Sequence, residues 1–263
     1  MPNSLSRILK DLKDSTNHTA QLLTNFSFKK LEAKHFIILT RERTGSTCLL
    51  DLLSSHSRIK TDPHIFYNYN SLPQVFKKKN VRYRNNIHGF KFKVQASSLE
   101  LTTQNQIKAE NGLRELVEQG VQIVYLQREN LVKQAVSWLL ADCAKLKKQN
   151  YRKGQKPIKI KSMNLQPNLL LERIQQSEKL LNFEKSILTD LPYLYLSYEK
   201  DLMPEEMHQI TLDRICNFLN IQSEKAITRY VKLSSNDLSD NISNYEEIYE
   251  CLKQTKYFDQ LDN

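Results

Sequence analysis

The stretch HFIILTRERTGSTCLLDLLSSH, residues 35–56, decides the fold of this chain. It begins with a short apolar run that is typical of a strand, passes through charged and small residues, and ends in an apolar pattern with helical spacing. A strand, a turn and a helix in this order often hold an anion, because the first turn of a helix presents backbone N–H groups and the positive end of the helix dipole. The stretch therefore predicts an anion-binding turn.

The residues of this turn have the chemistry that an anion requires. Arg43 supplies a permanent, forked cation, and Gly45 lets the backbone approach a ligand closely. Ser46 and Thr47 add hydroxyl donors. The competing interpretation is an ordinary helix cap without a ligand, in which Thr44 or Ser46 is the capping residue.

The familiar glycine-rich phosphate loops are absent from the sequence. The chain contains five glycines, and it has neither a G-x-x-x-x-G-K-[ST] loop nor a G-x-G-x-x-G fingerprint. The turn must therefore serve a different phosphate ligand.

The composition is that of a globular protein with a basic balance. The 263 residues are 40% hydrophobic and 26% charged, which allows a sizeable core. Lys and Arg number 39 against 29 Asp and Glu, a formal net charge of +10. This excess favours anionic partners but does not choose among nucleotides, nucleic acids, acidic lipids and acidic sugars.

Cysteine usage and hydropathy predict a cytoplasmic protein without a membrane span. No apolar run reaches the ~18 residues of a transmembrane helix, and the N-terminus lacks the apolar core of a signal peptide. The cysteines show no metal-ligand or redox spacing, so we expect reduced thiols and no metal site at Cys48, Cys143, Cys216 and Cys251.

Strand and helix patterns alternate along the rest of the chain. We expect the segment 88–95 to be a half-exposed strand, because apolar and basic residues alternate in it. Further strands are expected at 121–127 and 191–198, and helices at 111–120 (closed by Gly120), 129–148 and 205–221. This alternation predicts an α/β fold with a central, mainly parallel sheet that is flanked by helices.

We expect residues 1–263 to form a single domain, with a helical extension at 1–30. The segment 145–162 is strongly basic and contains Gly154 and Pro157. It is interpreted either as a solvated loop or as a mobile loop that faces the substrate.

The segment RTGSTCLLDLLSSH resembles the 5′-phosphosulfate loop of sulfotransferases that use 3′-phosphoadenosine 5′-phosphosulfate (PAPS). It is most similar to the bacterial and carbohydrate-type branch, in which arginine replaces the lysine of the cytosolic enzymes. The resemblance implies a P-loop-like fold and a 5′-phosphosulfate site formed by Arg43, Thr44, Gly45, Ser46, Thr47 and Cys48.

The segment 121–141 is similar to the 3′-phosphate site of the same family, a strand that ends in arginine and leads into a helix with a serine. The matching residues are Arg128 and Ser137. Because ligands lie beyond the carboxyl ends of parallel strands, Arg128 and the turn can hold two phosphates of one nucleotide. The alternatives are a surface ion pair of Arg128 with Glu129 and a Ser137 hydroxyl bonded to its own helix.

The segment 195–202 resembles the late Tyr-Glu-Asp-Leu strand of the family, here with Lys200 inserted. The match implies that Tyr198 contacts adenine, although a tyrosine at a strand end can also be a core residue. Together with 215–221 and 242–257, the resemblance extends from about residue 34 to 258.

The resemblance implies in-line, metal-independent transfer of a sulfuryl group from PAPS to a hydroxyl or amine acceptor, which could be a carbohydrate, lipid or peptide. Positioning and charge stabilisation dominate such a reaction, as in phosphoryl transfer. Arg43 would neutralise charge on the leaving 5′-phosphate.

A hydroxyl acceptor requires a general base. His64 occupies the neighbourhood in which the branch often places an acidic residue, and histidine titrates near neutral pH. Asp62, Glu42 and His88 are rivals, whereas His56 within the helix motif is expected to be structural.

Lys91 and Lys93 share one face of the strand at 88–95. They are expected either to bind the sulfate or the acceptor, or to form a solvated face.

Other function classes stay open at this point. An ATP-dependent kinase-like transferase lacks its Gly-Lys-Ser/Thr loop here. A nucleic-acid-binding protein is permitted by the charge, but the sequence has no such motif. A non-catalytic nucleotide-binding protein is the remaining alternative.

Overall fold

The computed structural model describes residues 34–66, 86–94, 102–143, 162–229, 235 and 237–261, with the backbone alone at 63–66, 142 and 143. All of these residues belong to one compact unit, Glu32–Asn263. The predicted extension at 1–30 and the basic segment up to residue 161 lie outside the described ranges.

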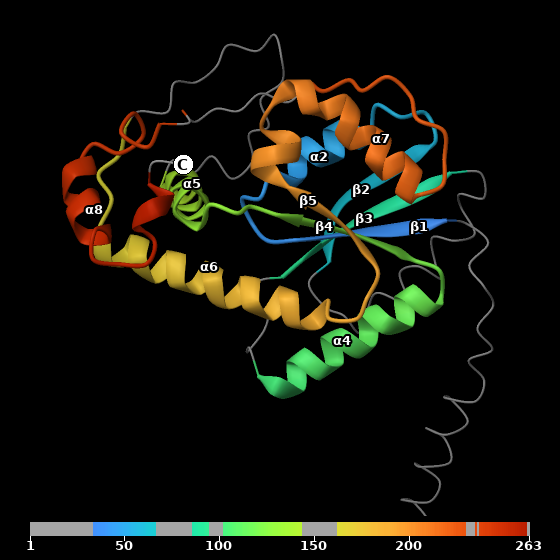
Figure 1. The fold of residues 1–263 in the computed structure, drawn as a ribbon, viewed down its shortest axis with the longest axis horizontal. Coiled ribbons are helices and arrows are strands. Elements are labelled where there is room, and N and C mark those ends of the chain that lie inside the picture. The colour runs from blue at the N-terminus through green and yellow to red at the C-terminus, as the bar shows by residue number, and fades with distance from the viewer. Residues whose placement is uncertain are drawn as a thin grey trace, which may run out of the picture. The chain divides into compact units, whose positions relative to one another are not determined.

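Five strands of the described chain form one parallel sheet (Figure 1). In order across the sheet they are β2 (Ile59–Phe66), β3 (Ile87–Lys93), β1 (His35–Thr40), β4 (Gln122–Gln127) and β5 (Tyr193–Ser197). The strand of the opening motif is therefore the central strand, and all six of its residues are buried. This arrangement confirms the predicted α/β fold with a parallel sheet.

Helices cover both faces of the sheet (Figure 1). On one face lie α2 (Ser46–Leu53) and α7 (His208–Phe218), and on the other lie α4 (Thr103–Glu118) and α6 (Pro167–Ile187). Both α5 (Leu131–Cys143) and α8 (Tyr245–Leu252) pack against α6. The described short elements are the π-helix η3 (Tyr198–Leu202) and the 3₁₀ helices η4 (Glu205–Met207) and η5 (Phe258–Gln260).

The register of the sheet brings the carboxyl ends of the central strands to one edge. Thr40, at the end of β1, lies opposite Lys93 of β3 and Leu126 of β4. The turn that follows β1 and Arg128, which follows β4, therefore leave the sheet at the same edge. Ligands of parallel α/β sheets bind at this edge.

The prediction of a half-exposed strand at 88–95 was wrong. Every residue of β3 from Ile87 to Phe92 is buried, and Lys93 is partly exposed. The strand lies between β1 and β2 instead of at an edge. The lysines that alternate with its phenylalanines are therefore enclosed instead of solvated.

Strand β2 was not predicted, because Pro63 interrupts its pattern and proline is unfavourable within a sheet. The structure accommodates this residue with a shift of register between Asp62 and Ile65.

The predicted helix at 111–120 begins earlier, at Thr103, where the Thr102 side chain accepts a hydrogen bond from Asn105 N at 3.3 Å. Its predicted closure by Gly120 is confirmed. Gly120 has a φ of +87° and donates to the Val117 carbonyl at 2.9 Å, as at many helix C-termini.

Candidate active site

The turn after β1 has an unusual backbone. Arg43 has a φ of +61°, a left-handed conformation that is rare for a residue with a side chain, and Gly45 has a φ of +85°. The buried Thr44 fastens the turn to β1, because its hydroxyl donates to the Arg41 carbonyl at 3.0 Å and contacts the Thr40 hydroxyl.

Helix α2 begins without a side-chain cap. Its N-cap residue is Gly45, so the interpretation in which Thr44 or Ser46 caps the helix was wrong. The first N–H groups of a helix have no partner within the helix. Those of α2 face the edge of the sheet that Arg128 also reaches, as an anion site requires.

Gly45 leaves no room for a side chain. A Cβ atom at this position would lie 2.3 Å from Cδ2 of Tyr198. The guanidinium carbon of Arg128 lies 4.9 Å from the centroid of the Tyr198 ring, within the range of a cation–π contact. Tyr198 thus joins the turn to Arg128, and its predicted contact with adenine stays a prediction.

Arg43, Arg128 and Ser137 come together, although they belong to separate segments. Arg43 Nε donates to Ser137 Oγ at 3.1 Å, and Arg128 Nη1 donates to the Arg43 carbonyl at 3.2 Å. The two predicted phosphate sites are therefore neighbours in the structure. Neither alternative accounts for these contacts, since Arg128 turns toward the loop and Ser137 toward Arg43.

Arg128 is buried, with 7% of its surface exposed. Burial lowers the pKa of its guanidinium, and Arg43 lowers it further, whereas Tyr198 and Glu199 oppose the shift. Its Nε is buried without a hydrogen-bond acceptor among the described residues, although Glu199 lies 3.6 Å away. An arginine stays charged in proteins, so an anion at this position would offset the cost of its burial.

Sequence reasoning assigned no role to Glu199. Its carboxylate accepts hydrogen bonds from the backbone N–H groups of Glu129 (2.9 Å) and Asn130 (3.3 Å), ahead of α5, and pairs with Arg128. The sequence signal that could have identified Glu199 is its place after Tyr198 at the end of one strand, because Arg128 follows the end of another strand.

The inserted Lys200 lies in the π-helix η3, closed by a hydrogen bond from Met203 N to the Tyr198 carbonyl at 2.8 Å. A π-turn accommodates one extra residue. The Lys200 side chain is exposed and pairs with Glu129 at 3.0 Å, so the insertion does not displace Tyr198 from the turn.

Lys91 and Lys93 do not form the solvated face that was one of the two expectations. Lys91 is 7% exposed, and burial together with Lys93 lowers the pKa of its ammonium group to about 8. Burial also lowers the pKa of Lys93, although Glu42 opposes this shift. Lys93 Nζ lies 3.8 Å from Glu42, so β3 adds positive charge beside the turn.

Glu42, one of the candidate bases, is already engaged. Its carboxylate accepts a hydrogen bond from the Trp138 indole at 2.8 Å and lies 3.7 Å from Arg173 Nη2. The Arg173 guanidinium in turn lies over the indole ring, 4.0 Å from its centroid.

His88 lies at the wrong end of the sheet for a catalytic base. It pairs with His35 at the start of β1, whereas the turn follows the other end of that strand. Lys93 lies five positions after His88 along the strand, a distance of roughly 16 Å.

His64 lies on β2, between Asp62 and Ile65, where the register with β3 shifts. The side chain of His64 is outside the described part of the structure, so its role as the base stays a prediction. Asp62 is opposite Phe90 and lies further from the carboxyl end of the sheet than His64 does.

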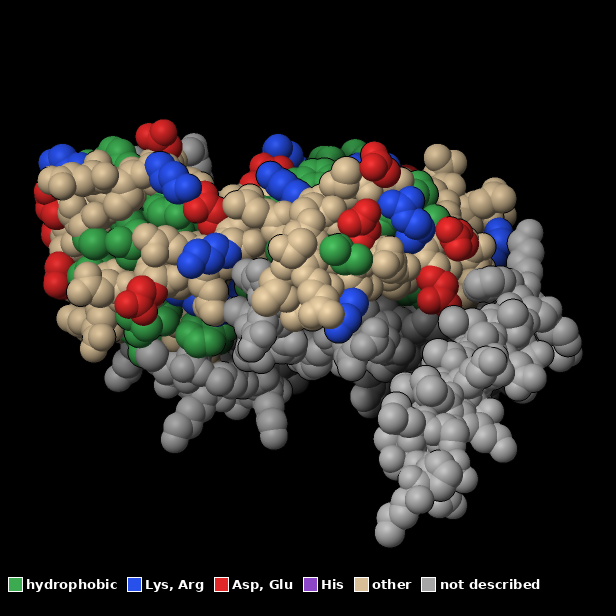
Figure 2. Space-filling view, turned by 90° about the horizontal axis from the view of Figure 1, so that it is seen from below, with side chains coloured by type: hydrophobic (Ala, Val, Ile, Leu, Met, Phe, Trp, Pro, Cys, Tyr) green, Lys and Arg blue, Asp and Glu red, His purple; other side chains and the backbone are tan. Residues whose placement is uncertain are grey.

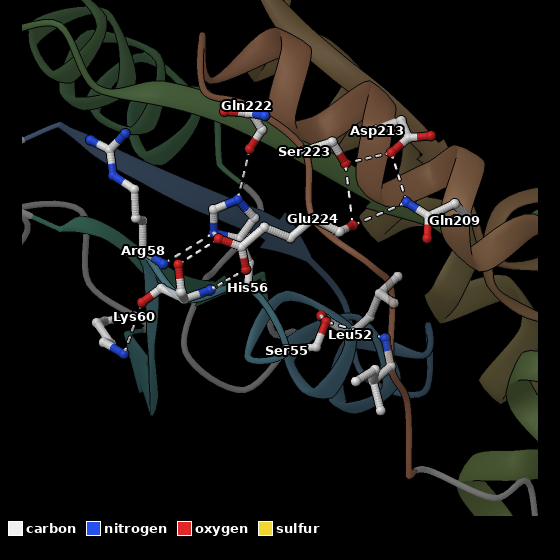
Figure 3. Close-up of polar contacts among 12 residues, drawn as sticks. Leu52, Ser55, His56, Arg58, Lys60, Gln209, Asp213, Gln222, Ser223 and Glu224 are labelled. Atoms are coloured by element: carbon white, nitrogen blue, oxygen red, sulfur yellow. Dashed lines mark hydrogen bonds and ion pairs between the residues drawn. The ribbon is translucent and has the colours of Figure 1, made fainter.

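His56 follows the C-terminal end of α2, where a network of hydrogen bonds holds it (Figure 3). Its Nδ1 accepts from Arg58 N at 3.1 Å, so its Nε2 donates to the Gln222 carbonyl at 2.9 Å. Glu224 caps the same corner by accepting from Ser57 N at 2.8 Å. These contacts join α2 to the segment after α7 and explain the residue without a catalytic role.

The side chain of Cys48, which was predicted to belong to the phosphosulfate site, is buried in α2. Its thiol is buried beside Asp51 and Thr228, and burial raises the pKa of the thiol to about 11. It is therefore a core residue of α2 whose N–H group belongs to the first turn.

Among the described residues, no three His, Cys, Asp or Glu side chains gather as potential metal ligands. The same residues contain no helix with the length and apolarity needed to cross a membrane.

A family model for the sulfotransferase domain matches residues 33–258, which include every residue of the site. One similar solved structure is the crystal structure of a sulfotransferase from Alicyclobacillus acidocaldarius, with 10% sequence identity and a TM-score of 0.46. The match covers 87% of this chain and 94% of that chain. No curated protein matches the chain.

Proposed function

The chain belongs to the sulfotransferase family, and we propose that it transfers a sulfuryl group from PAPS to a hydroxyl or amine group of an acceptor, in line and without a metal ion. The observation that carries this proposal is the convergence of Arg43, Arg128 and Ser137 beside the uncapped start of α2.

The donor site fits a nucleotide with phosphate groups at both its 3′ and 5′ positions. We assign the 5′-phosphosulfate to residues 43–48, through Arg43 and the N–H groups of the first turn. We assign the 3′-phosphate to Arg128 and Ser137, which provide a forked cation and a hydroxyl. The half-buried Tyr198 ring is assigned to the adenine.

PAPS, when bound, supplies the sulfuryl group and departs as 3′,5′-ADP. Arg43 and the N–H groups of α2 stabilise negative charge on the leaving phosphate, because they are fixed before the reaction begins. Lys93 adds positive charge beside Arg43. Lys91, whose pKa is about 8, strengthens this field in its protonated form.

The acceptor loses a proton during the transfer, and we assign that proton to His64. Its place on β2, next to the strand that carries the two lysines, motivates this assignment. A general base contributes about 10²–10⁴-fold to a rate. His64→Ala should reduce turnover to that extent while leaving the affinity for 3′,5′-ADP unchanged; unchanged turnover would eliminate His64.

Thermal unfolding with a ligand panel tests the proposed donor. We expect 3′,5′-ADP to raise the melting temperature, and we expect Mg-ATP and a single-stranded oligonucleotide to leave it unchanged. The shift should be lost in Arg43→Ala and Arg128→Ala and retained in Arg114→Ala, a control in an exposed ion pair on α4. Stabilisation by Mg-ATP but not by 3′,5′-ADP would contradict the proposal and favour a kinase-like transferase.

The face of the molecule drawn in Figure 2 does not have the charge pattern of a nucleic-acid-binding surface. On the face drawn in Figure 2, Lys and Arg side chains are interspersed with Asp and Glu among the described residues. Nucleic-acid-binding proteins concentrate Lys and Arg in a patch or stripe that follows the phosphate backbone.

A further inference from the structure

We infer that Glu42 is a positioning residue, which ties the turn to α5 and thereby holds Arg43 in the left-handed conformation in which its side chain reaches Ser137. This inference rests on the proposed function for the choice of probe, 3′,5′-ADP. The tie itself consists of contacts within the chain and can be tested without a ligand.

The conformation of Arg43 needs an explanation. A non-glycine residue at a φ of +61° is strained, and such a residue persists only where its surroundings determine its conformation. Neither Arg43 nor its neighbour Glu42 has the small side chain that would favour this backbone. Thr44 fastens the turn to β1, and contacts with other segments add to this restraint.

One such contact is the hydrogen bond from Arg128 to the Arg43 carbonyl, and helix α5 supplies the others from a single face. Gln134 Nε2 donates to the Glu42 carbonyl at 2.6 Å, and Trp138 Nε1 donates to the Glu42 carboxylate at 2.8 Å. Ser137 accepts from Arg43 Nε at 3.1 Å. Residues three and four positions apart lie on the same side of a helix, so α5 holds both Glu42 and Arg43 at once.

The charge of Glu42 opposes the function of the site, which makes its presence informative. A carboxylate beside an anion site repels the ligand, so on charge alone its removal should strengthen binding. Lys93 and Arg173, at 3.8 and 3.7 Å, already pair with this carboxylate. The carboxylate of Glu42 is thus held by contacts within the chain, which suits a residue that fixes the turn.

Two substitutions separate the hydrogen bond of Glu42 from its charge. Glu42→Gln keeps an acceptor for the indole and removes the charge, so we expect 3′,5′-ADP to bind equally well or about two- to tenfold more tightly. Glu42→Ala removes both, and the population with Arg43 in place should fall. We expect binding about tenfold weaker than in the wild type, equivalent to about 1.4 kcal/mol.

Trp138 is the single tryptophan of the chain, so its fluorescence reports directly on this contact. Titration of 3′,5′-ADP can be followed by its emission in the wild type and in both Glu42 variants. Calorimetry replaces fluorescence for Trp138→Phe, which lacks the indole donor and should weaken binding like Glu42→Ala. Glu110→Ala is the matched control, because Glu110 and Glu42 are both 31% exposed and paired with a cation.

Amide hydrogen exchange of residues 41–47 provides the readout that needs no ligand. Exchange should be faster in Glu42→Ala and close to the wild type in Glu42→Gln. Equal exchange in Glu42→Ala and the wild type would overturn the inference, as would 3′,5′-ADP binding to Glu42→Ala as tightly as to Glu42→Gln. If the wild type binds no 3′,5′-ADP, the proposed function fails and the exchange result alone decides the role of Glu42.

Discussion

Gly45→Ala should destabilise the fold and disturb the site, for two separable reasons. The first is the backbone, because a left-handed conformation costs about 1–2 kcal/mol for a residue with a Cβ atom. The second is the contact with Tyr198, since the new Cβ atom would lie 2.3 Å from the ring. The ring must move out of its rotamer, at about 0.5–1.5 kcal/mol, and lose its contact with Arg128, at about 0.5–1 kcal/mol.

Gly120→Ala isolates the first of these costs. Gly120 has nearly the same φ, +87°, but a Cβ atom there would meet nothing within 4 Å. We therefore expect a loss of about 1–2 kcal/mol for Gly120→Ala and about 2–4.5 kcal/mol for Gly45→Ala. The effect of alanine on the unfolded chain is common to both variants and cancels in their difference.

Equilibrium denaturation in urea measures the free energy of unfolding of Gly45→Ala and Gly120→Ala. The double variant Gly45→Ala/Tyr198→Ala measures the coupling between positions 45 and 198. Removal of the ring should relieve the part of the loss that exceeds that of Gly120→Ala. Equal losses in Gly45→Ala and Gly120→Ala would refute the contact with Tyr198 and, with it, the geometry of the turn.

Two further predictions concern charge near the site. Lys91 has a pKa of about 8 in the folded protein against 10.5 for an ordinary lysine. Between these pH values the unfolded chain binds more protons than the folded protein, so the contribution of Lys91 makes the free energy of unfolding rise from pH 8 to pH 10.5. Lys91→Met should flatten this rise in a series of urea denaturations. Equal slopes for the wild type and Lys91→Met over this range would contradict the burial of Lys91. Glu199→Ala removes the carboxylate that accepts hydrogen bonds from the N–H groups ahead of α5, so it should lower the free energy of unfolding by about 0.5–2 kcal/mol. Glu250→Ala, in an exposed ion pair on α8, should lower it by less than about 1 kcal/mol. A loss below about 0.5 kcal/mol in Glu199→Ala, measured by urea denaturation, would show that Glu199 has no capping role.

Local pattern and the rules of parallel sheets were enough to predict much of this molecule. The strand, turn and helix at 35–56 follow from residues adjacent in sequence. The meeting of Arg128 with the turn follows from the rule that parallel strands end at one edge. Strands β1, β3, β4 and β5, helices α2, α4, α5 and α7 and the closure by Gly120 could therefore be predicted, whereas helix α6 was not.

The remaining features depend on partners that are distant in sequence. A solvated face was one of two expectations for Lys91, because its strand alternates, but its burial follows from the register that sets it opposite Ile38 of the central strand. The role of Glu42 depends on Trp138, 96 residues away. Local periodicity carries no information on such contacts.

Strand β2 escaped prediction for a different reason. Its irregular pairing at Pro63 and His64 erases the alternation by which strands are identified. The general base could not be assigned from the pattern for the same reason, since its candidate, His64, lies on this strand.

The recognition of the 3′-phosphate tests the central claim most directly. Titration calorimetry should compare 3′,5′-ADP with 5′-AMP, which lacks only that phosphate, in the wild type and in Arg128→Ala. A hydrogen bond to a charged group contributes about 1.5–3 kcal/mol, so the wild type should prefer 3′,5′-ADP by at least about tenfold. The preference should largely disappear in Arg128→Ala. Equal affinity of the wild type for both nucleotides, or an undiminished preference in Arg128→Ala, would contradict the account.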